Sequence, residues 1–257
     1  MFLPLQYIGR KTLDFFQKVG ILSIFIAKTI NGLIRRPFYL NLILRQIISI
    51  GYFSLPVVAM TAVFSGAVLA LQSYTGFSRF SAESSIATVV VLSITRELGP
   101  VLAGLMVAGR VGASIAAEIG TMKVTEQIDA LFTLSTDPIK YLVGPRVIAS
   151  VLTMPCLVLI GDIIGVYGGY VVAVHVLGFN TGSYLHQTWN ILETMDVVSG
   201  LIKAAAFGFI VAVMGCYQGY YSGRGAQGVG AATTYAVVSA SILILIINYF
   251  LTQVLFS

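Results

Sequence analysis

The chain is built from long apolar runs that are separated by short polar stretches. A helix needs about 20 mostly apolar residues to cross a bilayer, and five runs reach that length. Because a backbone inside lipid has to satisfy its own hydrogen bonds, each run is predicted to be a helix. The expected membrane spans are residues 46–72, 86–109, 147–177, 197–219 and 229–255.

Residues 1–36 have a different pattern, which is that of an amphipathic helix. Its apolar positions recur at helical spacing and are Leu5, Ile8, Phe15, Phe16, Val19, Leu22, Ile26, Ile30 and Leu33. Lys11 and Lys18 fall on another face. A basic amphipathic helix of this kind usually lies in the plane of the membrane surface. An additional span over residues 19–34 is the alternative, and the charge of Lys28 argues against it.

The composition agrees with a membrane protein. Of the 257 residues, 57% are hydrophobic and 10% are charged, and the mean hydropathy is +0.92. Soluble domains carry about 25% charged residues, so this chain cannot cover itself with a charged surface. The formal net charge of +5 suits anionic lipid headgroups and does not require a nucleic acid. The predicted fold class is therefore an all-α integral membrane protein.

The distribution of basic residues predicts the orientation, because cytoplasmic loops collect Lys and Arg. With the N-terminus in the cytoplasm, that side collects Arg10, Lys11, Lys18, Lys28, Arg35, Arg36, Arg45, Arg110, Lys123, Lys140, Arg146 and Arg224. The opposite side, which then includes the C-terminus, collects Arg79 and Lys203. Arg96 remains inside a span.

Sequence motifs of catalysis and nucleotide binding are missing. The chain contains no G-x-x-x-x-G-K-[ST] loop for ATP, no G-x-S-x-G turn and no H-E-x-x-H helix. We therefore expect no catalytic residues, no metal site and no cofactor in this chain. Any ATP hydrolysis has to take place on a partner.

The segment S-I-T-R-E-L-G-P, residues 93–100, places two charges inside an apolar span. Arg96 and Glu97 are adjacent and point about 100° apart on a helix, so each needs a partner from elsewhere. Pro100 cannot donate to the carbonyl of Arg96, which predicts a distorted helix with a free carbonyl oxygen. Intramembrane charges usually mark a functional site. A polar cavity wall and a structural ion pair between helices both remain open.

The polar residues after Gly112 predict a cytoplasmic helix between the second and third spans, over about residues 112–138. Residues Ile115, Ile119, Met122, Glu126 and Asp129 approximate one stripe of this helix. Such a helix either binds a cytoplasmic partner or simply connects two spans.

Small residues recur at four-residue spacing within the spans. The rows are Gly161, Gly165 and Gly169; Gly104, Ala108 and Gly112; and Ala204, Gly208 and Ala212. Small residues let helix backbones approach closely in a membrane, so these rows are predicted to be packing surfaces.

Several of these motifs together resemble one family. The segments R-E-L-G-P, A-G-R-V-G-A-S, A-E-I-G-T-M-K-V-T-E-Q-I-D-A-L and D-P follow one another as in MlaE-type permeases, the membrane subunits of MCE-associated ABC transporters. The resemblance extends from about residue 40 to the C-terminus and is densest over 83–146. It implies a homodimer in which each subunit has an interfacial helix, residues 1–36, and a five-helix transmembrane domain, residues 37–257.

The resemblance also implies partners and a location. A cytoplasmic P-loop ATPase binds ATP and Mg²⁺, a hexameric MCE-domain protein covers the periplasmic face, and a small STAS-like protein binds the ATPase. Members of the family move phospholipids between the inner and outer membranes of Gram-negative bacteria, which maintains the lipid asymmetry of the outer membrane. This chain is therefore expected in the bacterial inner membrane.

Matching positions carry the expected roles. The resemblance assigns ATPase coupling to Arg110, Glu118, Ile119, Gly120, Met122, Glu126 and Gln127. It assigns lipid binding to Leu69, Tyr74, Phe77, Phe80, Arg96 and Glu97.

Two other functions remain open from the residues. An ion-coupled secondary carrier would use Arg96, Glu97 and Asp162 as a relay, although the chain shows no inverted repeat. A membrane scaffold without a transport path would need only the rows of small residues.

Overall fold

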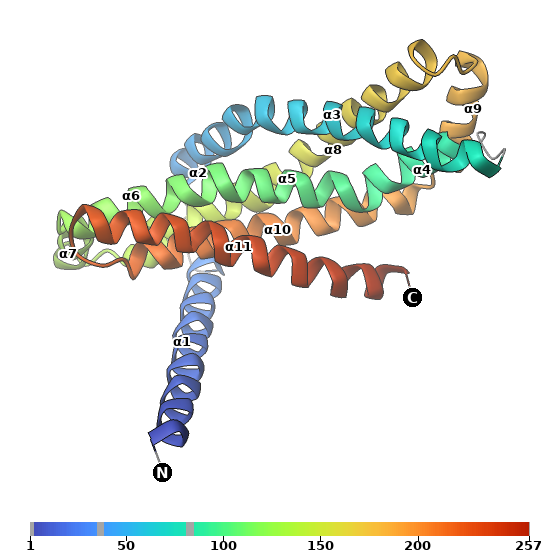
Figure 1. Ribbon diagram of the computed structural model, residues 1–257. Helices are drawn as coiled ribbons and strands as arrows, with labels where there is room; N and C mark the ends of the chain where they lie inside the picture. The colour runs from blue at the N-terminus through green and yellow to red at the C-terminus, as the bar shows by residue number, and fades with distance from the viewer. Residues whose placement is uncertain (1–2, 35–38, 81–84, 257) are drawn as a thin grey trace.

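The computed structural model describes residues 3–34, 39–80 and 85–256. Within these residues, five helical stretches are long and apolar enough to cross a membrane, as predicted. They run side by side along one axis (Figure 1). Their bounds are Leu40–Phe77, Ile86–Val124, Ile139–His175, Thr194–Tyr220 and Gly225–Phe256.

Three of these stretches consist of several consecutive helical segments. The first joins α2 (Leu40–Ile47) to α3 (Phe53–Phe77), the second joins α4 (Ile86–Ser93), α5 (Gly99–Val107) and α6 (Ala113–Val124), and the third ends in α8 (Gly144–His175). The fourth and fifth are α10 (Thr194–Tyr220) and α11 (Gly225–Phe256). Two short helices, α7 (Gln127–Thr133) and α9 (Thr181–Ile191), lie at opposite ends of the bundle (Figure 1).

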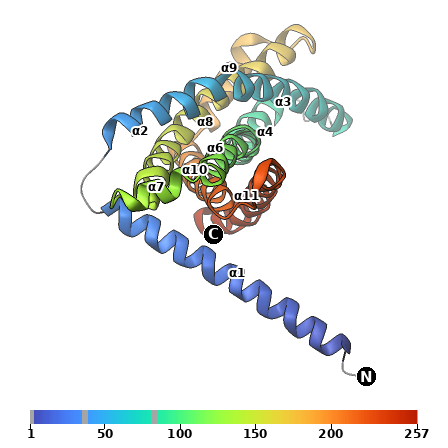
Figure 2. The same cartoon turned by 90° about the vertical axis from the view of Figure 1, so that its left-hand side faces the viewer.

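The N-terminal helix α1 (Leu3–Ile34) crosses the bundle axis instead of following it (Figures 1 and 2). Its second half is held by Phe25, which is 1% exposed and packs against the rings of Tyr217 and Tyr220 at centroid distances of 5.6 and 6.0 Å. Its first half projects away and exposes apolar side chains such as Leu13 and Phe16. This direction agrees with a helix in the membrane surface. The break expected at Arg35-Arg36-Pro37 lies outside the described residues.

The second span is longer than predicted: the helix does not break at Gly112, and the separate helix in the expected range 112–138 is the short α7. The stretch Ile86–Val124 is helical throughout, and Gly112 packs against Val211 of α10. The chain turns only at Glu126, whose φ of 59° is left-handed. The polar residues after Gly112 do not mark a new element, because one side of this helix end packs into the core through Ile115 and Ile119 while the other side is exposed and tolerates polar residues.

Three spans contain π-helical turns that precede a proline. These turns cover Ile48–Tyr52, Ile94–Leu98 and Ile139–Val143, and they are followed by Pro56, Pro100 and Pro145. A proline has no N–H and its ring clashes with the carbonyl four residues earlier, so a wider turn there relieves the clash. Each such turn leaves backbone carbonyls available to other partners.

The rows of small residues pack helices together, as predicted. Gly161 and Gly165 of α8 face Val58 and the carbonyl of Ala62 on α3. Gly208 of α10 faces the carbonyl of Ser150 on α8, and the Ser150 hydroxyl donates back to the Gly208 carbonyl at 2.8 Å. Such contacts replace a hydrophobic driving force, which is weak between helices in lipid.

At the end of the bundle away from α1, helix α9 buries its own residue Tyr184. This residue is 3% exposed and lies against Tyr170 and Phe179. Burial raises the pKa of Tyr184 to about 12, so its phenol stays neutral at physiological pH.

The contact between α3 and α8 predicts that substituting Ala for Gly changes the stability in opposite directions at Gly66 and Gly76, which both belong to α3. A Cβ on Gly66 would lie 1.9 Å from the Gly165 carbonyl oxygen, whereas a Cβ on Gly76 meets nothing within 4 Å. We expect Gly66→Ala to destabilise the protein by about 1–3 kcal/mol through overpacking. We expect Gly76→Ala to be neutral or stabilising by up to about 1 kcal/mol, because Ala favours a helix over Gly. Thermal unfolding in detergent measures both, and equal effects would contradict the packing described.

Candidate functional site

Six polar side chains form one connected group inside the bundle, which we call the charged cluster. Its members are Arg96, Glu97, Asp196, Lys203, Asn248 and Thr252. They come from the π-helical turn Ile94–Leu98 of the second span and from α10 and α11. The cluster lies in the half of the bundle that is farther from α1 (Figure 1).

Lys203 is at the centre of the cluster and is fully buried. Its ammonium donates to the carbonyl oxygen of Arg96 at 2.8 Å, to Oε1 of Glu97 at 2.7 Å and to Oγ1 of Thr252 at 2.8 Å. An ammonium has three donors, and all three are satisfied. This complete set of partners allows a charge to stay inside an apolar bundle.

Arg96 pairs with Asp196 in the first turn of α10. Its Nε and Nη2 atoms lie 2.7 and 2.5 Å from Oδ1 of Asp196. The other oxygen of Asp196 accepts the backbone N–H of Glu193 at 3.0 Å, which caps the helix. Arg96 also lies over the ring of Phe256 at 4.6 Å from its centroid. The side chain of Asp196 is 1% exposed, whereas that of Arg96 is 35% exposed.

Glu97 connects the cluster to α11. Its Oε2 accepts the amide of Asn248 at 2.9 Å, and its Oε1 lies 2.9 Å from the hydroxyl of Thr252. The Glu97 side chain is 36% exposed. Two positive and two negative side chains thus alternate, with one member of each ion pair buried and the other half-exposed.

The structure confirms three features that were predicted for the segment around Pro100. The helix is distorted there, the Arg96 carbonyl is free for another partner, and Arg96 and Glu97 each find a different counterion. Lys203, which falls inside the predicted span 197–219, lies within α10 and is buried. An ammonium can be buried there because the distorted turn offers it a carbonyl.

The residues predicted to bind lipid fall into two groups. Leu69, Tyr74 and Phe77 are partly buried and pack on an apolar cluster that includes Val90 and Ile94. This cluster joins α3, α4 and α8, whereas Arg96 and Glu97 contact α10 and α11 on the other side. The two groups therefore lie on different sides of the second span. The side chain of Phe80 lies outside the described part of the chain.

Asp162 does not belong to the charged cluster. It lies on α8, is 4% exposed and approaches Gly99 so closely that a Cβ there would be 1.8 Å from Oδ1. Neither of its carboxylate oxygens has a hydrogen-bond partner among the described residues. No described hydrogen bond joins it to Arg96 or Glu97, so the three residues do not form a continuous relay in this conformation.

The opposite end of the bundle holds most residues with a predicted coupling role. Arg110, at the π-helical turn Ala108–Gly112, donates to the Ser54 hydroxyl at 2.7 Å and to the Ser49 carbonyl at 2.8 Å. It therefore ties the second span to the first. Glu118 pairs with the buried Arg146 of α8 at 2.7 Å.

The remaining coupling residues differ in exposure. Ile119 and Gly120 are buried against α10 and α11, and Met122 is partly buried, so these three hold the helix in place. Glu126 and Gln127 are exposed at the corner where α7 begins.

The surface around α7 combines acidic and apolar side chains. Glu126 and Asp129 lie beside the exposed rings and chains of Phe132 and Leu134, which are 56% and 73% exposed. A cavity of about 910 Å³ lies between α7 and the turn that joins α10 to α11. Lys123 holds this turn through a 3.0 Å hydrogen bond to the Ser222 carbonyl. Exposed apolar side chains next to a cavity are typical of a docking surface.

Comparison with known proteins identifies the family. The profile of the family described as Permease MlaE matches residues 43–254, which include both the charged cluster up to Thr252 and the α7 surface. The chain belongs to the MlaE permease family. This permease is similar to a protein of Rickettsia felis that is named a probable ABC transporter permease, with 70% identity over 249 residues that cover 97% of this chain and 96% of the relative.

More distant relatives also match most of the permease. The intermembrane phospholipid transport system permease protein MlaE of Haemophilus influenzae is 34% identical over 254 residues, which are 97% of this chain and 96% of that protein. A probable ABC transporter permease of Synechocystis is 43% identical over 213 residues, which are 83% and 81% of the two chains.

Four members of the cluster were not identified as site residues from the sequence of the permease: Asp196, Lys203, Asn248 and Thr252. Signals were present for three of them. Lys203 is a charge within an apolar run, and Asn248 and Thr252 are polar residues at i and i+4 of the last span, so they share a face. Asp196 precedes the predicted span and gave no signal of this kind.

The buried ion pair predicts the behaviour of three variants. Lys203→Met leaves Glu97 without its cation, and we expect a loss of about 3 kcal/mol of stability, the lower end for breaking a buried pair because Glu97 is 36% exposed. Adding Glu97→Gln should recover most of this loss, and Glu97→Gln alone should be destabilising. Thermal unfolding of the single and double variants gives the coupling. Additive losses would contradict a direct pair.

Proposed function

We propose that this chain is the membrane subunit of an ABC transporter that moves phospholipids between the inner and outer membranes, driven by ATP hydrolysis on a separate ATPase. The observation that carries the proposal is the charged cluster: a buried polar group in an apolar bundle that leaves one cation and one anion half-exposed. The printed name of the Haemophilus influenzae relative, which specifies intermembrane phospholipid transport, supports the substrate class.

The exposed halves of the cluster suit a lipid headgroup. Arg96 uses Nε and Nη2 on Asp196, so its remaining donors can bind a phosphate. The neighbouring carboxylate of Glu97 is half-exposed, so it can accept hydrogen bonds from an ammonium. A zwitterionic headgroup carries both groups, whereas an anionic headgroup would meet the carboxylate of Glu97. Among phospholipids, a zwitterionic headgroup is therefore the best match.

The proposal extends to the assembly. We place the N-terminus, α1 and the α7 surface in the cytoplasm and the C-terminus in the periplasm, which follows the excess of basic residues at the α1 and α7 end. Assembly as a homodimer is part of the proposal. The further partners are a hexameric MCE-domain protein and a small STAS-like protein that binds the ATPase. The process that the transporter serves is the maintenance of outer-membrane lipid asymmetry.

The transport proposal is tested with a charge-balanced variant. Arg96→Gln combined with Asp196→Asn removes one charge of each sign and leaves no buried carboxylate unpaired. In proteoliposomes that contain the complete transporter, we expect ATP-dependent phospholipid transfer to fall about tenfold or more, because a hydrogen bond to a charged group contributes about 1.5–3 kcal/mol. Arg79→Gln, an exposed change at the end of the first span, is the matched control.

Transfer of phospholipid at the unchanged rate by the double variant, with the control equally active, would contradict a headgroup role for the cluster. Transport that follows an ion gradient and needs no ATP would instead favour the secondary carrier.

The α7 surface is proposed to dock the ATPase. Glu126→Lys reverses the charge of an exposed side chain at the start of α7. The substitution adds no backbone strain, because Glu and Lys are equally disfavoured at the positive φ of this position. We expect the variant to insert into the membrane normally and to lose the ATPase during purification of the complex. Asp14→Lys, the same charge change on exposed α1, should keep it. Normal recovery of the ATPase with Glu126→Lys would argue against this surface.

A further inference from the structure

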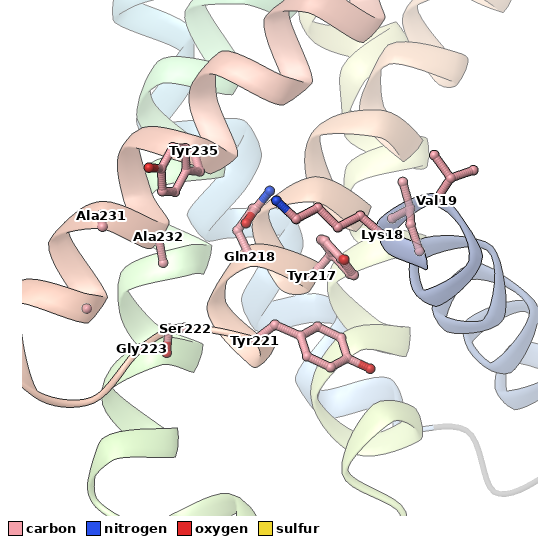
Figure 3. Close-up of a pocket in the computed structure, with 12 residues that line it drawn as sticks. Lys18, Val19, Tyr217, Gln218, Tyr221, Ser222, Gly223, Ala231, Ala232 and Tyr235 are labelled. Carbon is pink, nitrogen blue, oxygen red and sulfur yellow. The ribbon is translucent and has the colours of Figure 1, made fainter. Parts of the chain in front are cut away.

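A second cavity lies at the end of the bundle opposite to the charged cluster. It has a volume of about 660 Å³ and opens between α1, α10 and α11 (Figure 3). Lys18 and Val19 of α1 form one wall, Tyr217 and Gln218 of α10 form the floor, and Tyr235 of α11 lies on the far wall (Figure 3). Ligand cavities commonly measure about 300–1,000 Å³, so the space is large enough for a headgroup with the start of its acyl chains.

The polar groups of this cavity are positive or neutral. None of the described residues that line it is acidic. Figure 3 shows the ammonium of Lys18 and the amide of Gln218 pointing into the same part of the space. Ser222, which is 7% exposed, adds a hydroxyl that has no hydrogen-bond partner among the described residues. The first turn of α11 contributes Gly228, and the N-terminus of a helix favours an anion.

The rest of the lining is apolar and continuous with the outer surface of the bundle. Leu22, Ala231 and Ala232 lie beside the rings of Tyr217 and Tyr235. Tyr235 is 63% exposed. Other large apolar side chains farther along α11 are exposed too, such as Ile242 at 53%. An acyl chain that begins in the cavity can therefore continue along α11 into the bilayer.

The position of α1 selects the kind of ligand. This helix lies across the bundle axis, as a helix in the membrane surface does, so Lys18 stands at the level of lipid headgroups. We propose that the cavity binds an anionic phospholipid of the leaflet nearest α1, with the phosphate against Lys18 and an acyl chain along α11. The lipid fills the gap that separates α1 from α11 and fastens the projecting half of α1 to the bundle. This site is separate from the charged cluster and does not depend on transport.

The binding test uses the full chain in detergent and two phospholipids. Native mass spectrometry measures the binding of phosphatidylglycerol, which is anionic, and of phosphatidylcholine, which is zwitterionic. We expect Lys18→Gln to weaken phosphatidylglycerol binding about fivefold, the contribution of one Lys at an anionic membrane surface. Lys28→Gln, the same change at an exposed position of α1 that does not line the cavity, is the matched control and should bind normally.

A second variant and a cross-link locate the ligand. Ala231→Trp fills the cavity from α11 and should weaken phosphatidylglycerol binding at least as much as Lys18→Gln. A photoreactive p-benzoylphenylalanine in place of Tyr235 should give an adduct with the mass of a phospholipid. Equal binding by the Lys18 and Lys28 variants would overturn the proposal. A Tyr235 cross-link to a second copy of the chain would overturn it too, because the cavity would then be part of a subunit interface.

Discussion

The bundle depends on burying the ammonium of Lys203 without leaving any of its hydrogen bonds unmade. Its three partners belong to two other spans, so the ammonium fixes the second, fourth and fifth spans at one point. An ammonium without acceptors would be intolerable in lipid. The distorted turn before Pro100 supplies one acceptor from the backbone itself, and the small residues along α10 let the helices come close enough to supply the others.

Much of the fold could be predicted because a bilayer restricts the backbone so strongly. Five apolar runs gave five helices, and the rows of small residues gave the contacts between α3, α8 and α10. The partners of Arg96 and Glu97 could not be predicted. The sequence shows that two charges need counterions, but Asp196 and Lys203 are about 100 residues away, and helix order alone does not fix which helices meet.

The end of the second span shows a different kind of error. Polarity after Gly112 predicts a change of element, but the helix continues because Ile115 and Ile119 keep one of its sides in the core. What stops this helix is the left-handed conformation of Glu126, for which Glu gives no sequence signal, since Gly or Asn would be the usual residues there. Arg110 likewise carries a structural role, a tie to Ser54, that its position in a family motif did not reveal.

The balance of charge in the cluster has an electrical consequence. Arg96, Lys203, Glu97 and Asp196 carry formal charges that sum to zero. Moving one elementary charge through the membrane potential involves about 2.3 kcal/mol per 100 mV, but moving these four side chains together involves none. A translation of the cluster as a rigid unit is therefore indifferent to the voltage across the membrane. The work of displacing a neutral or zwitterionic lipid past it has to come from a source other than the electrical potential.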